Sequence, residues 1–371
     1  MRKIGLKSFS VVVVLLSTVA VAGEPGLGEE KMRKANEAAS TVVKERMQQE
    51  RPADAKVLAD VADSDIVVVR GTYDRVEDVL RTLGIKHTVV NPEDVGGLQL
   101  NAKQLLIIDC PGGLTREGIA RVRKFVNAGG YLYTTDWALT NVVEAAFPGF
   151  IRFNGHATAN DVVEVEVKET ENNLLKHLTL SKENPKWWLE SSSYPIQVLN
   201  KEKVDVLITS KEMGKKYGET PIAVHFRYGD GQVLHIASHF YLQQNQTRTV
   251  AEKKKGTEYL KKDSSLSEGT KKALENKVAS DVAAGDLSSA YAAQQMTSNI
   301  VVERKKDQGR INSLYGKALK TAVAKPKATS GAAPAPALSE GTKVKELERD
   351  GDRVKVRTME GDEAWVPASA L

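Results

Sequence analysis

The stretch LLIIDCPGGLTREGIARVRKFVNAGGYLYTT, residues 105–135, decides the fold of this chain. It opens with a continuous run of branched apolar residues, which is typical of a strand buried on both faces. Thr115 is a suitable N-cap for a helix over 116–128, and the glycines at 129–130 end that helix. A second strand pattern follows at 131–135. This order predicts a parallel β–α–β unit.

The same alternation precedes this unit. The run Ile-Val-Val-Val at 66–69 predicts another buried strand, and 74–83 predicts a helix closed by Gly84. A further strand is expected at 87–90. We therefore expect an α/β fold of flavodoxin-like type, in which helices sandwich a parallel sheet.

After residue 150 the pattern changes to strands that follow one another. The triplet Gly229-Asp230-Gly231 is a tight hairpin signal between two of them. The expected strands cover 162–167, 204–209, 222–227 and 232–237. They predict an antiparallel extension of the parallel sheet.

The first residues have the features of a secretory signal peptide. Three cationic residues, Arg2, Lys3 and Lys7, precede an apolar run that ends in Ala20-Val21-Ala22 before Gly23. Small residues at this spacing suit signal peptidase. The run is short for a membrane span, which needs about 20 residues. We expect cleavage near Ala22-Gly23 and a periplasmic or secreted protein, with an uncleaved anchor as the alternative.

Composition excludes other classes of protein. The net charge of +5 is too modest to indicate a nucleic-acid partner, and no later stretch is apolar enough to span a bilayer. Cys110 is the single cysteine of the chain, so an internal disulfide is impossible. An exported protein without disulfides is typical of the bacterial periplasm.

Composition also divides the chain into segments. We expect a signal peptide at 1–22, a helical N-terminal arm at 23–63, a main domain at 64–320, an Ala/Pro linker at 321–337 and a small all-β module at 338–371. The arm is polar, which predicts a solvated arm or surface helix. The main domain includes a lysine-rich insertion, 243–287, which we interpret as solvated; a polyanion-binding patch is the alternative.

Four features of the main domain occur together. They are the loop Pro111-Gly112-Gly113 after a strand, a helix ending at 125–130, the strand at 131–135 and a late strand ending in Ala237-Ser238-His239. In this combination residues 65–306 resemble the class I glutamine amidotransferase-like superfamily, in its divergent ThuA-like branches. The resemblance implies ligand binding at the carboxyl ends of the strands.

The amidotransferase nucleophile is missing from the place where the resemblance puts it. In that superfamily a cysteine occupies the sharp turn after the strand that matches 131–135, but here the turn reads Thr134-Thr135-Asp136-Trp137. The family histidine is followed by Pro-Glu, whereas His239 is followed by Phe240-Tyr241. The acid of the family triad is therefore missing as well, and the resemblance implies a pseudoenzyme.

The residues expected at the carboxyl ends of the strands are the site candidates. The ligand-binding candidates are Gly112, Gly113, Thr135, Asp136, Trp137 and His239. No residue is assigned a catalytic role; the candidates for one are Asp136, His239 and Cys110. Cys110 lies beside the loop that offers an oxyanion hole in the family, so a small buried apolar role is its simpler interpretation.

Alternative roles for these residues stay open. Asp136, His156 and His239 suit a metal site or an acid–base pair. The competing interpretation makes Asp136 a helix cap and His239 a hydrogen-bonded remnant. Trp187-Trp188 suits packing, because neighbours on a strand point to opposite faces and at most one can stack on a sugar. No cofactor and no metal is expected.

The C-terminal module has a pattern of its own. Val354-Lys355-Val356-Arg357 is followed by Gly361 and by Ala364-Trp365-Val366-Pro367. This pattern resembles the second half of a bacterial SH3 domain, whose first strands would fall in the Ala/Pro segment. The resemblance implies a peptidoglycan or peptide ligand, with Trp365 either a contact or a core and rim aromatic.

These observations predict an exported, non-catalytic envelope protein that binds a ligand or partner. Peptidoglycan, an envelope protein, a small molecule or a glycan are the candidate partners. The alternative is a divergent hydrolase or isomerase that acts on a small molecule or glycan in a retained pocket. A third possibility is a scaffold without any pocket function.

Overall fold

The central feature of the computed structural model is an eight-stranded sheet with the strand order β2-β1-β3-β4-β12-β11-β10-β7. The structure describes residues 27–167, 172–181, 183–190, 192–239, 250–279, 281–323 and 337–371. The expected signal peptide and most of the Ala/Pro linker lie outside these residues.

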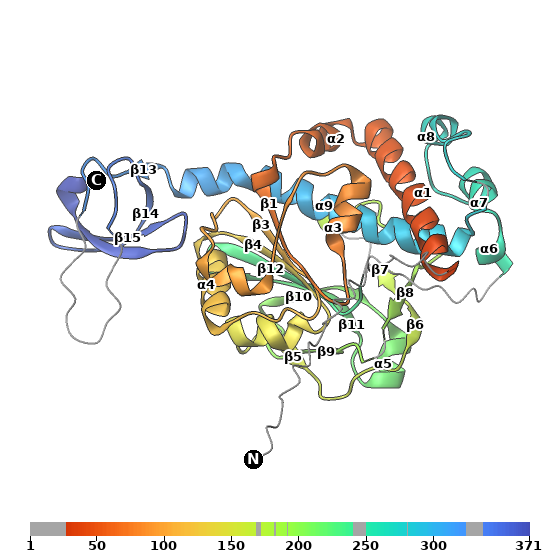
Figure 1. Cartoon of the computed structure of the whole chain (residues 1–371), viewed down its shortest axis with the longest axis horizontal. Helices are drawn as coiled ribbons and strands as arrows, with labels where there is room; N and C mark the ends of the chain where they lie inside the picture. Colours follow the sequence, from red (N-terminus) through yellow and green to blue (C-terminus); the bar gives the residue numbers. More distant parts are fainter. Residues whose placement is uncertain are drawn as a thin grey trace, which may run out of the picture.

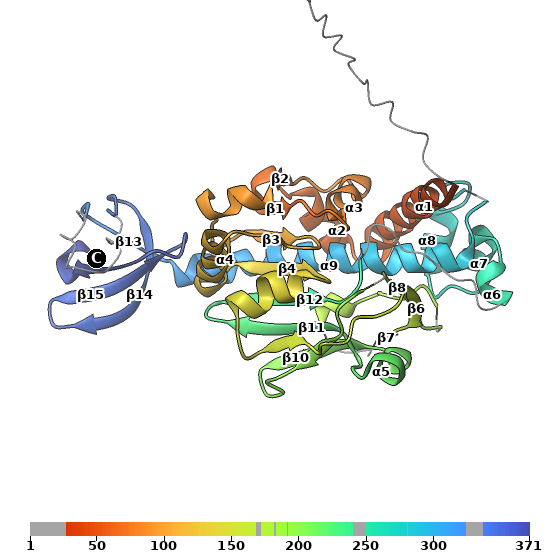
Figure 2. The ribbon, with the colours of Figure 1, turned by 60° about the horizontal axis from the view of Figure 1, so that its bottom comes forward.

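The sheet is parallel in one half and antiparallel in the other. The parallel strands are β1 (Ile66–Val69), β2 (Thr88–Val90), β3 (Leu105–Ile108), β4 (Tyr131–Thr135) and β12 (Gly231–Ile236). The antiparallel strands are β7 (Glu166–Val167), β10 (Val204–Thr209) and β11 (Pro221–Tyr228). This arrangement confirms the α/β prediction, with helices on both faces of the sheet (Figure 2).

The quoted stretch folds as its sequence predicts. Helix α4 (Arg116–Ala128) connects β3 and β4, and the Thr115 hydroxyl accepts a hydrogen bond from the Gly118 amide at its start. Gly129 takes a positive φ of 125° where the helix ends. The apolar face of α4, with Val122, Phe125 and Val126, packs on the sheet together with the π-helical turn η3 (Leu139–Glu144).

The opposite face of the sheet is covered by α1 (Leu27–Glu50), α2 (Pro52–Ala59), α3 (Val76–Leu83) and α9 (Ala284–Leu314). The interpretation of residues 23–63 as a solvated arm is wrong for α1. Its inner face is buried against α9, with Ala35, Ala39 and Val42 fully covered. Small residues allow the two helices to approach closely, and the Arg46 guanidinium reaches the Tyr291 hydroxyl at 2.8 Å.

Helix α9 extends from the lysine-rich region to the C-terminal module (Figure 1). The lysine-rich region forms the short helices α6 (Val250–Lys253), α7 (Gly256–Lys262) and α8 (Glu268–Ala273) near the start of α9. Several of its lysines are paired with carboxylates: Lys254 with Asp263, Lys262 with Glu258, Lys271 with Glu268 and Lys277 with Glu45. This local neutralisation weakens the alternative of a polyanion-binding patch.

Two small antiparallel sheets lie outside the main sheet. They pair β5 (Ile151–Phe153) with β9 (Ile196–Val198), and β6 (Asp161–Glu164) with β8 (Lys186–Leu189). Helix α5 (Lys211–Tyr217) and the 3₁₀ turns η1 (Asp63–Asp65), η2 (Pro92–Gly97), η4 (Asn173–Leu175) and η5 (Ala368–Ala370) complete the described elements. The Ser238 hydroxyl donates to the Trp188 carbonyl at 2.7 Å, which fixes β8 beside the end of β12.

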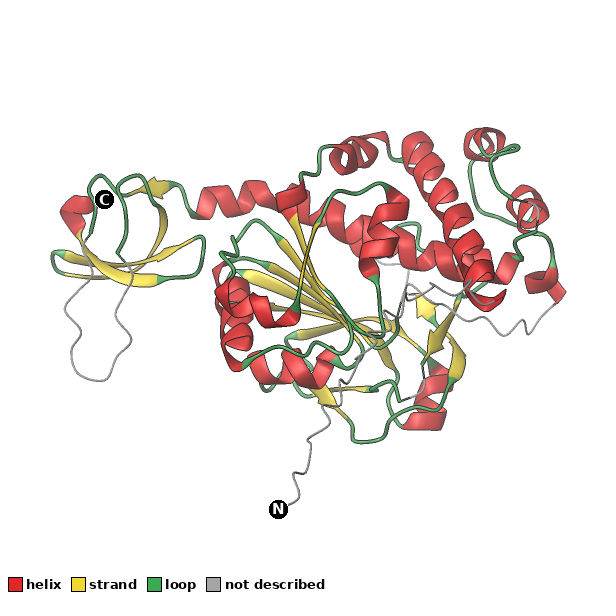
Figure 3. Cartoon of the chain, in the orientation of Figure 1, coloured by secondary structure: helices red, strands yellow, loops and turns green. Residues whose placement is uncertain are grey.

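The C-terminal module is a four-stranded antiparallel sheet (Figure 3). Its strands are β13 (Lys317–Ala318), β14 (Lys343–Asp350), β15 (Arg353–Thr358) and β16 (Glu363–Pro367). The sheet and its small core, which includes Leu319, thus begin before the Ala/Pro segment rather than at residue 338.

The C-terminal sheet contacts the main domain directly. The Asp230 carboxylate, in the β11–β12 turn, accepts hydrogen bonds from Lys345 Nζ at 2.6 Å and Arg357 Nη1 at 3.4 Å. Met359 packs with Ile311 and Tyr315 of the α9 end. This contact lies at the end of the main sheet opposite to the carboxyl ends of its parallel strands. Within the part of the chain that the structure describes, no helix has both the length and the hydropathy that a membrane crossing needs.

Candidate functional site

Three candidate residues meet at the carboxyl ends of neighbouring strands. Cys110 follows β3, Asp136 follows β4 and His239 follows β12. The Cys110 Sγ, an Asp136 carboxylate oxygen and a His239 ring nitrogen all lie within 4.8 Å of one another. The three residues are 1%, 2% and 2% exposed. The parallel sheet thus assembles a buried cluster from residues 26 and more positions apart in the chain.

Asp136 occupies a sharp turn. Its φ is +41°, a left-handed conformation that non-glycine residues seldom adopt, and its amide donates to the Ile236 carbonyl at 2.8 Å. Strain of this kind costs on the order of 1 kcal/mol and persists only where the surroundings enforce it. The turn lies where the resemblance predicts a nucleophile, but it presents a carboxylate.

The Asp136 carboxylate is held by polar groups from the loop after β8. One oxygen accepts from the Tyr194 amide at 2.8 Å, and the other accepts from the Ser193 hydroxyl at 3.0 Å. That second oxygen lies 3.2 Å from His239 Nε2. Burial raises the pKa of Asp136, although these three partners oppose the rise. The interpretation of Asp136 as a helix cap is wrong, because its side chain points to residues 193–194 and to His239.

His239 lies between two carboxylates. Its Nε2 faces Asp136, and its Nδ1 lies 2.6 Å from Oε2 of Glu190. Burial alone would lower the pKa of His239, but hydrogen bonding with Asp136, Cys110 and Glu190 outweighs burial and raises that pKa well above its usual value. These contacts favour the charged form of the imidazole.

Glu190 is the site residue that the sequence did not reveal. It directly follows β8, and its side chain remains 33% exposed while it reaches the buried ring of His239. The acid that follows the family histidine is absent from this sequence, and Glu190 places a different carboxylate beside His239 from elsewhere in the chain. The pairing of β8 with β6, the contact of Trp188 with Ser238 and the Ser193 amide bonded to the Glu190 carbonyl place it there.

Cys110 is buried beside this group. Its amide donates to the Thr135 hydroxyl at 3.0 Å, and its carbonyl accepts from the amides of Thr72 and Tyr73 at 2.9 and 3.2 Å. Burial raises the pKa of the Cys110 thiol, and its hydrogen bond with His239 offsets that rise only in part. Thr135 thus acts as a positioning residue for the backbone of Cys110, and the thiol is protonated in neutral solution.

The two loop glycines, Gly112 and Gly113, differ in the space around them. Gly112 has a φ of +71°, and a Cβ there would lie 2.8 Å from Val142 Cγ2 and 2.9 Å from Ala138 Cβ. Gly113 is exposed, and a Cβ there would meet nothing within 4 Å. The Gly112 backbone therefore packs tightly against η3, whereas the Gly113 backbone faces open space.

Aromatic side chains pack together next to Asp136. The Trp137 indole donates to the Ser192 carbonyl at 2.7 Å, stacks on Tyr194 with ring centroids 5.6 Å apart, and meets Tyr73 edge-on at 5.3 Å. Trp137 is half-buried and Tyr73 is 46% exposed. The three rings thus pack against one another beside the turn at Asp136.

Two other tryptophans and a histidine lie elsewhere. Trp187 is completely buried in the main core and Trp188 is 6% exposed, so packing is the role of both. His156 is exposed and is not part of the three-residue cluster. Of the residues expected together, Asp136 and His239 are neighbours, and Cys110 rather than His156 lies beside them.

A second group of buried acids lies behind Cys110. The Asp109 carboxylate accepts from the Val76 amide at 3.0 Å, at the start of α3. Burial and the neighbouring carboxylates of Asp74 and Glu77 raise the pKa of Asp109 well above its usual range. These surroundings favour the protonated form of Asp109.

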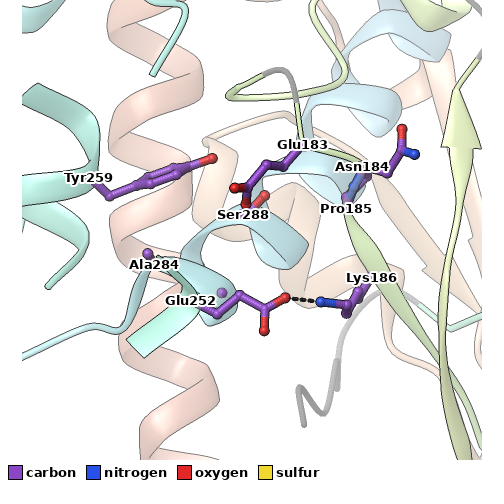
Figure 4. A pocket seen from close by; sticks show the side chains of 9 residues that line it. Glu183, Asn184, Pro185, Lys186, Glu252, Tyr259, Ala284 and Ser288 are labelled. Atoms are coloured by element: carbon purple, nitrogen blue, oxygen red, sulfur yellow. Dashed lines mark hydrogen bonds and ion pairs between the residues drawn. The ribbon is translucent and has the colours of Figure 1, made fainter. Parts of the chain in front are cut away.

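A separate pocket lies between β8 and the starts of α7 and α9 (Figure 4). The ion pair between Lys186 and Glu252 crosses it, and Tyr259 closes one side. Its lining contains none of Cys110, Asp136 and His239. This pocket is thus distinct from the buried cluster.

Comparison with known proteins gave structural similarities only. No protein-family model matches the chain, and no curated protein matches it. The structure is similar to a putative GMP synthase subunit from Thermoplasma acidophilum, at 12% identity over 67% of this chain and 96% of that one, with a TM-score of 0.39. A putative ThuA-like protein from Bacteroides uniformis is 13% identical over 48% of this chain and 82% of that one, with a TM-score of 0.34.

A β-galactosidase from Bacillus circulans is a further neighbour. It is 13% identical over 86% of this chain and 43% of that one, with a TM-score of 0.37. Similarities of this degree say nothing about the activity of this chain.

Proposed function

We propose that the protein is exported to the bacterial envelope and binds a ligand or partner there through an amidotransferase-like domain that performs no amide chemistry. One observation carries the proposal: the sharp turn after β4 presents Asp136, whose carboxylate is already engaged by Ser193, Tyr194 and His239. A carboxylate held in this way is not free to attack an amide carbon.

The position of the thiol supports the same proposal. Cys110 lies one strand away from the turn, is 1% exposed, and has a pKa that burial raises. A reactive cysteine needs a lowered pKa and partial exposure, and Cys110 has neither. The features at 1–22 support export, because a positive start and a short apolar run precede Ala20-Val21-Ala22.

The C-terminal sheet is proposed as an SH3-like attachment module for the cell wall or an envelope protein. Trp365 alternates with the buried residues Ala364 and Val366 on β16, so its ring lies on the outer face of the sheet. The Arg353 guanidinium lies 5.8 Å from the Trp365 ring centroid. An accessible aromatic ring beside a cation suits stacking on a sugar or a peptide.

Two assays test this function on residues 23–371. Ammonia release from glutamine should stay at the level of a heat-denatured sample; release that Cys110→Ser abolishes would contradict the proposal. Sedimentation with purified peptidoglycan sacculi should retain the wild-type chain and lose Trp365→Ala. The control Lys320→Ala changes an exposed residue outside the outer face of β16 and should be retained like the wild type.

A divergent hydrolase or isomerase is the second candidate. The observation that favours it is the placement of His239 between Asp136 at 3.2 Å and Glu190 at 2.6 Å, an arrangement that resembles an acid–base relay. Hydrolysis of a panel of aryl esters and aryl glycosides tests it. Turnover that His239→Gln abolishes would favour an enzyme. Turnover that survives His239→Gln would exclude His239 and its two carboxylates as the catalytic site.

A further inference from the structure

We propose that Cys110, Asp136 and His239 form a binding site for one divalent transition-metal ion of the zinc type, with Glu190 as a positioning residue. Nothing in the proposed ligand-binding function requires this site. The inference stands on donor type, spacing and the fixing of each ligand.

The donor set selects the class of metal. A thiolate, an imidazole and a carboxylate are the ligands that zinc takes in proteins, whereas magnesium and calcium take oxygen alone. On binding, the ion displaces the proton of the Cys110 thiol and the proton of His239 Nε2, which are released to solvent. Thiolate and imidazole donors also suit cobalt and other late first-row ions. The single cysteine of the chain is one of the three donors.

One edge of the donor triangle has the length of a tetrahedral site, and the other two have an upper bound of 4.8 Å. Bond lengths of about 2.0–2.3 Å place neighbouring ligand atoms about 3.3–3.6 Å apart. His239 Nε2 and Asp136 Oδ2 are 3.2 Å apart, and the Cys110 Sγ completes a triangle whose edges are all within 4.8 Å. Three protein ligands leave the fourth position of a tetrahedral ion to water or to a bound molecule, as in catalytic zinc sites.

His239 is oriented as metal-bound histidines are. A ligating histidine commonly donates the proton of its other ring nitrogen to a carboxylate, which fixes the tautomer and the ring. Glu190 Oε2 lies 2.6 Å from Nδ1, so Nε2 is the nitrogen turned to Asp136 and Cys110. Glu190 therefore occupies the position of the carboxylate that supports a metal-bound histidine.

The other two ligands are also fixed before any ion arrives. The Asp136 carboxylate is held by Tyr194 and Ser193, and the Cys110 backbone is held by Thr135. Each ligand directly follows or closely follows a strand of one sheet. Side chains on rigid elements with their own hydrogen bonds are what a metal site requires.

The same contacts would also form in a hydrogen-bonded cluster that binds no metal. A metal titration distinguishes a metal site from such a cluster. Residues 23–371 are prepared without an affinity tag that binds metal, stripped with a chelator and titrated with Co²⁺. We expect one ion per chain and a thiolate-to-cobalt charge-transfer band in the near ultraviolet. That band reports Cys110 alone, because the chain has no other cysteine. Zinc should displace cobalt and remove the band.

Variants identify the ligands. Cys110→Ser should abolish the band, and Asp136→Asn and His239→Gln should weaken binding, each with circular dichroism to show a folded chain. Glu190→Gln should keep the band but lower the affinity about 10–100-fold, the usual effect of removing such a support. Glu190→Asp should recover part of that loss. His156→Gln, which changes an exposed histidine, is the matched control.

Each outcome decides the proposal. One ion per chain, lost in Cys110→Ser and retained in His156→Gln, supports it. Absence of the charge-transfer band in the folded wild-type chain, or equal binding by Cys110→Ser and the wild type, overturns it. Binding that falls equally in Glu190→Gln and His156→Gln would remove the positioning role of Glu190.

Discussion

The ring of buried His239 lies 2.6 Å, through Nδ1, from Oε2 of the partly exposed Glu190. This contact joins the end of β12 to the end of β8. It gives the histidine a carboxylate on the side away from Asp136. Glu190 is 33% exposed whereas His239 is 2% exposed, so Glu190 is the more accessible partner of this contact.

We predict that Glu190→Gln destabilises the metal-free chain by about 1–3 kcal/mol, because it leaves the buried imidazolium with one carboxylate fewer. The free energy of unfolding in urea measures the effect. Asp205→Asn is the matched control, since Asp205 faces His225 at 3.6 Å but is 75% exposed. It should change stability by less than about 0.5 kcal/mol. Equal effects in both variants would refute the special role of Glu190.

Removal of the Asp136 carboxylate should lower the free energy of unfolding by more than Glu190→Gln does. Asp136→Ala leaves His239 charged and the Tyr194 amide without its acceptor, so we expect a loss of about 3–5 kcal/mol in the free energy of unfolding. Asp136→Asn keeps the shape and tolerates the positive φ, and it should cost less than Asp136→Ala. A smaller loss in Asp136→Ala than in Asp136→Asn would argue against a buried ion pair.

The loop glycines provide a test of backbone packing. Gly112→Ala should destabilise the chain by about 2–4 kcal/mol, because its φ is +71° and its Cβ would meet Ala138 and Val142. Gly113→Ala, where a Cβ has open space, should change stability by less than about 0.5 kcal/mol. Thermal unfolding of the two variants gives the comparison, and similar shifts would contradict the close packing.

His235 should make the fold sensitive to acid. Its Nδ1 lies 2.8 Å from the Thr134 hydroxyl, and complete burial lowers its pKa from 6.5 to about 3. The folded chain resists protonation at His235, whereas the unfolded chain does not. The stability of the fold with neutral His235 is therefore fully present above pH 6.5 and is lost as the pH falls from 6.5 toward 3. The free energy of unfolding then falls by an amount that approaches about 1.4 kcal/mol per pH unit.

Urea unfolding at several pH values measures this dependence. His235→Leu should lower stability at pH 7, because it leaves Thr134 without its partner, and the difference from the wild type should narrow as the pH falls. His156→Gln, at an exposed position, should leave the wild-type dependence unchanged. A difference between His235→Leu and the wild type that stays constant with pH would show that His235 does not resist protonation.

Prediction from sequence worked where a pattern is local. The stretch 105–135 contains its own caps and apolar faces, so β3, α4 and β4 could be predicted with little error. The burial of α1 was missed because alanine fills much of its inner face, and alanine carries little hydrophobic signal. Strand β13 was missed because it has only two residues, which pair with β14 across the Ala/Pro segment.

The candidate site could be predicted only for the residues that follow strands of the main sheet. Cys110, Asp136 and His239 follow strands of one parallel sheet, and the rule that ligands gather at the carboxyl ends of such strands brought them together. Glu190 follows no such rule. It reaches His239 from a strand outside the main sheet, 49 positions earlier in the chain, through tertiary contacts of β8 that no local pattern encodes.

The alkylation rate of Cys110 by iodoacetamide, followed by mass spectrometry in the native metal-free chain, tests most directly the claim that the domain has no working nucleophile. The account predicts that native Cys110 is labelled many-fold more slowly than the same thiol in denaturant, because it is buried and its pKa is raised. Labelling of the native chain as fast as a free thiol, or faster, would contradict the account.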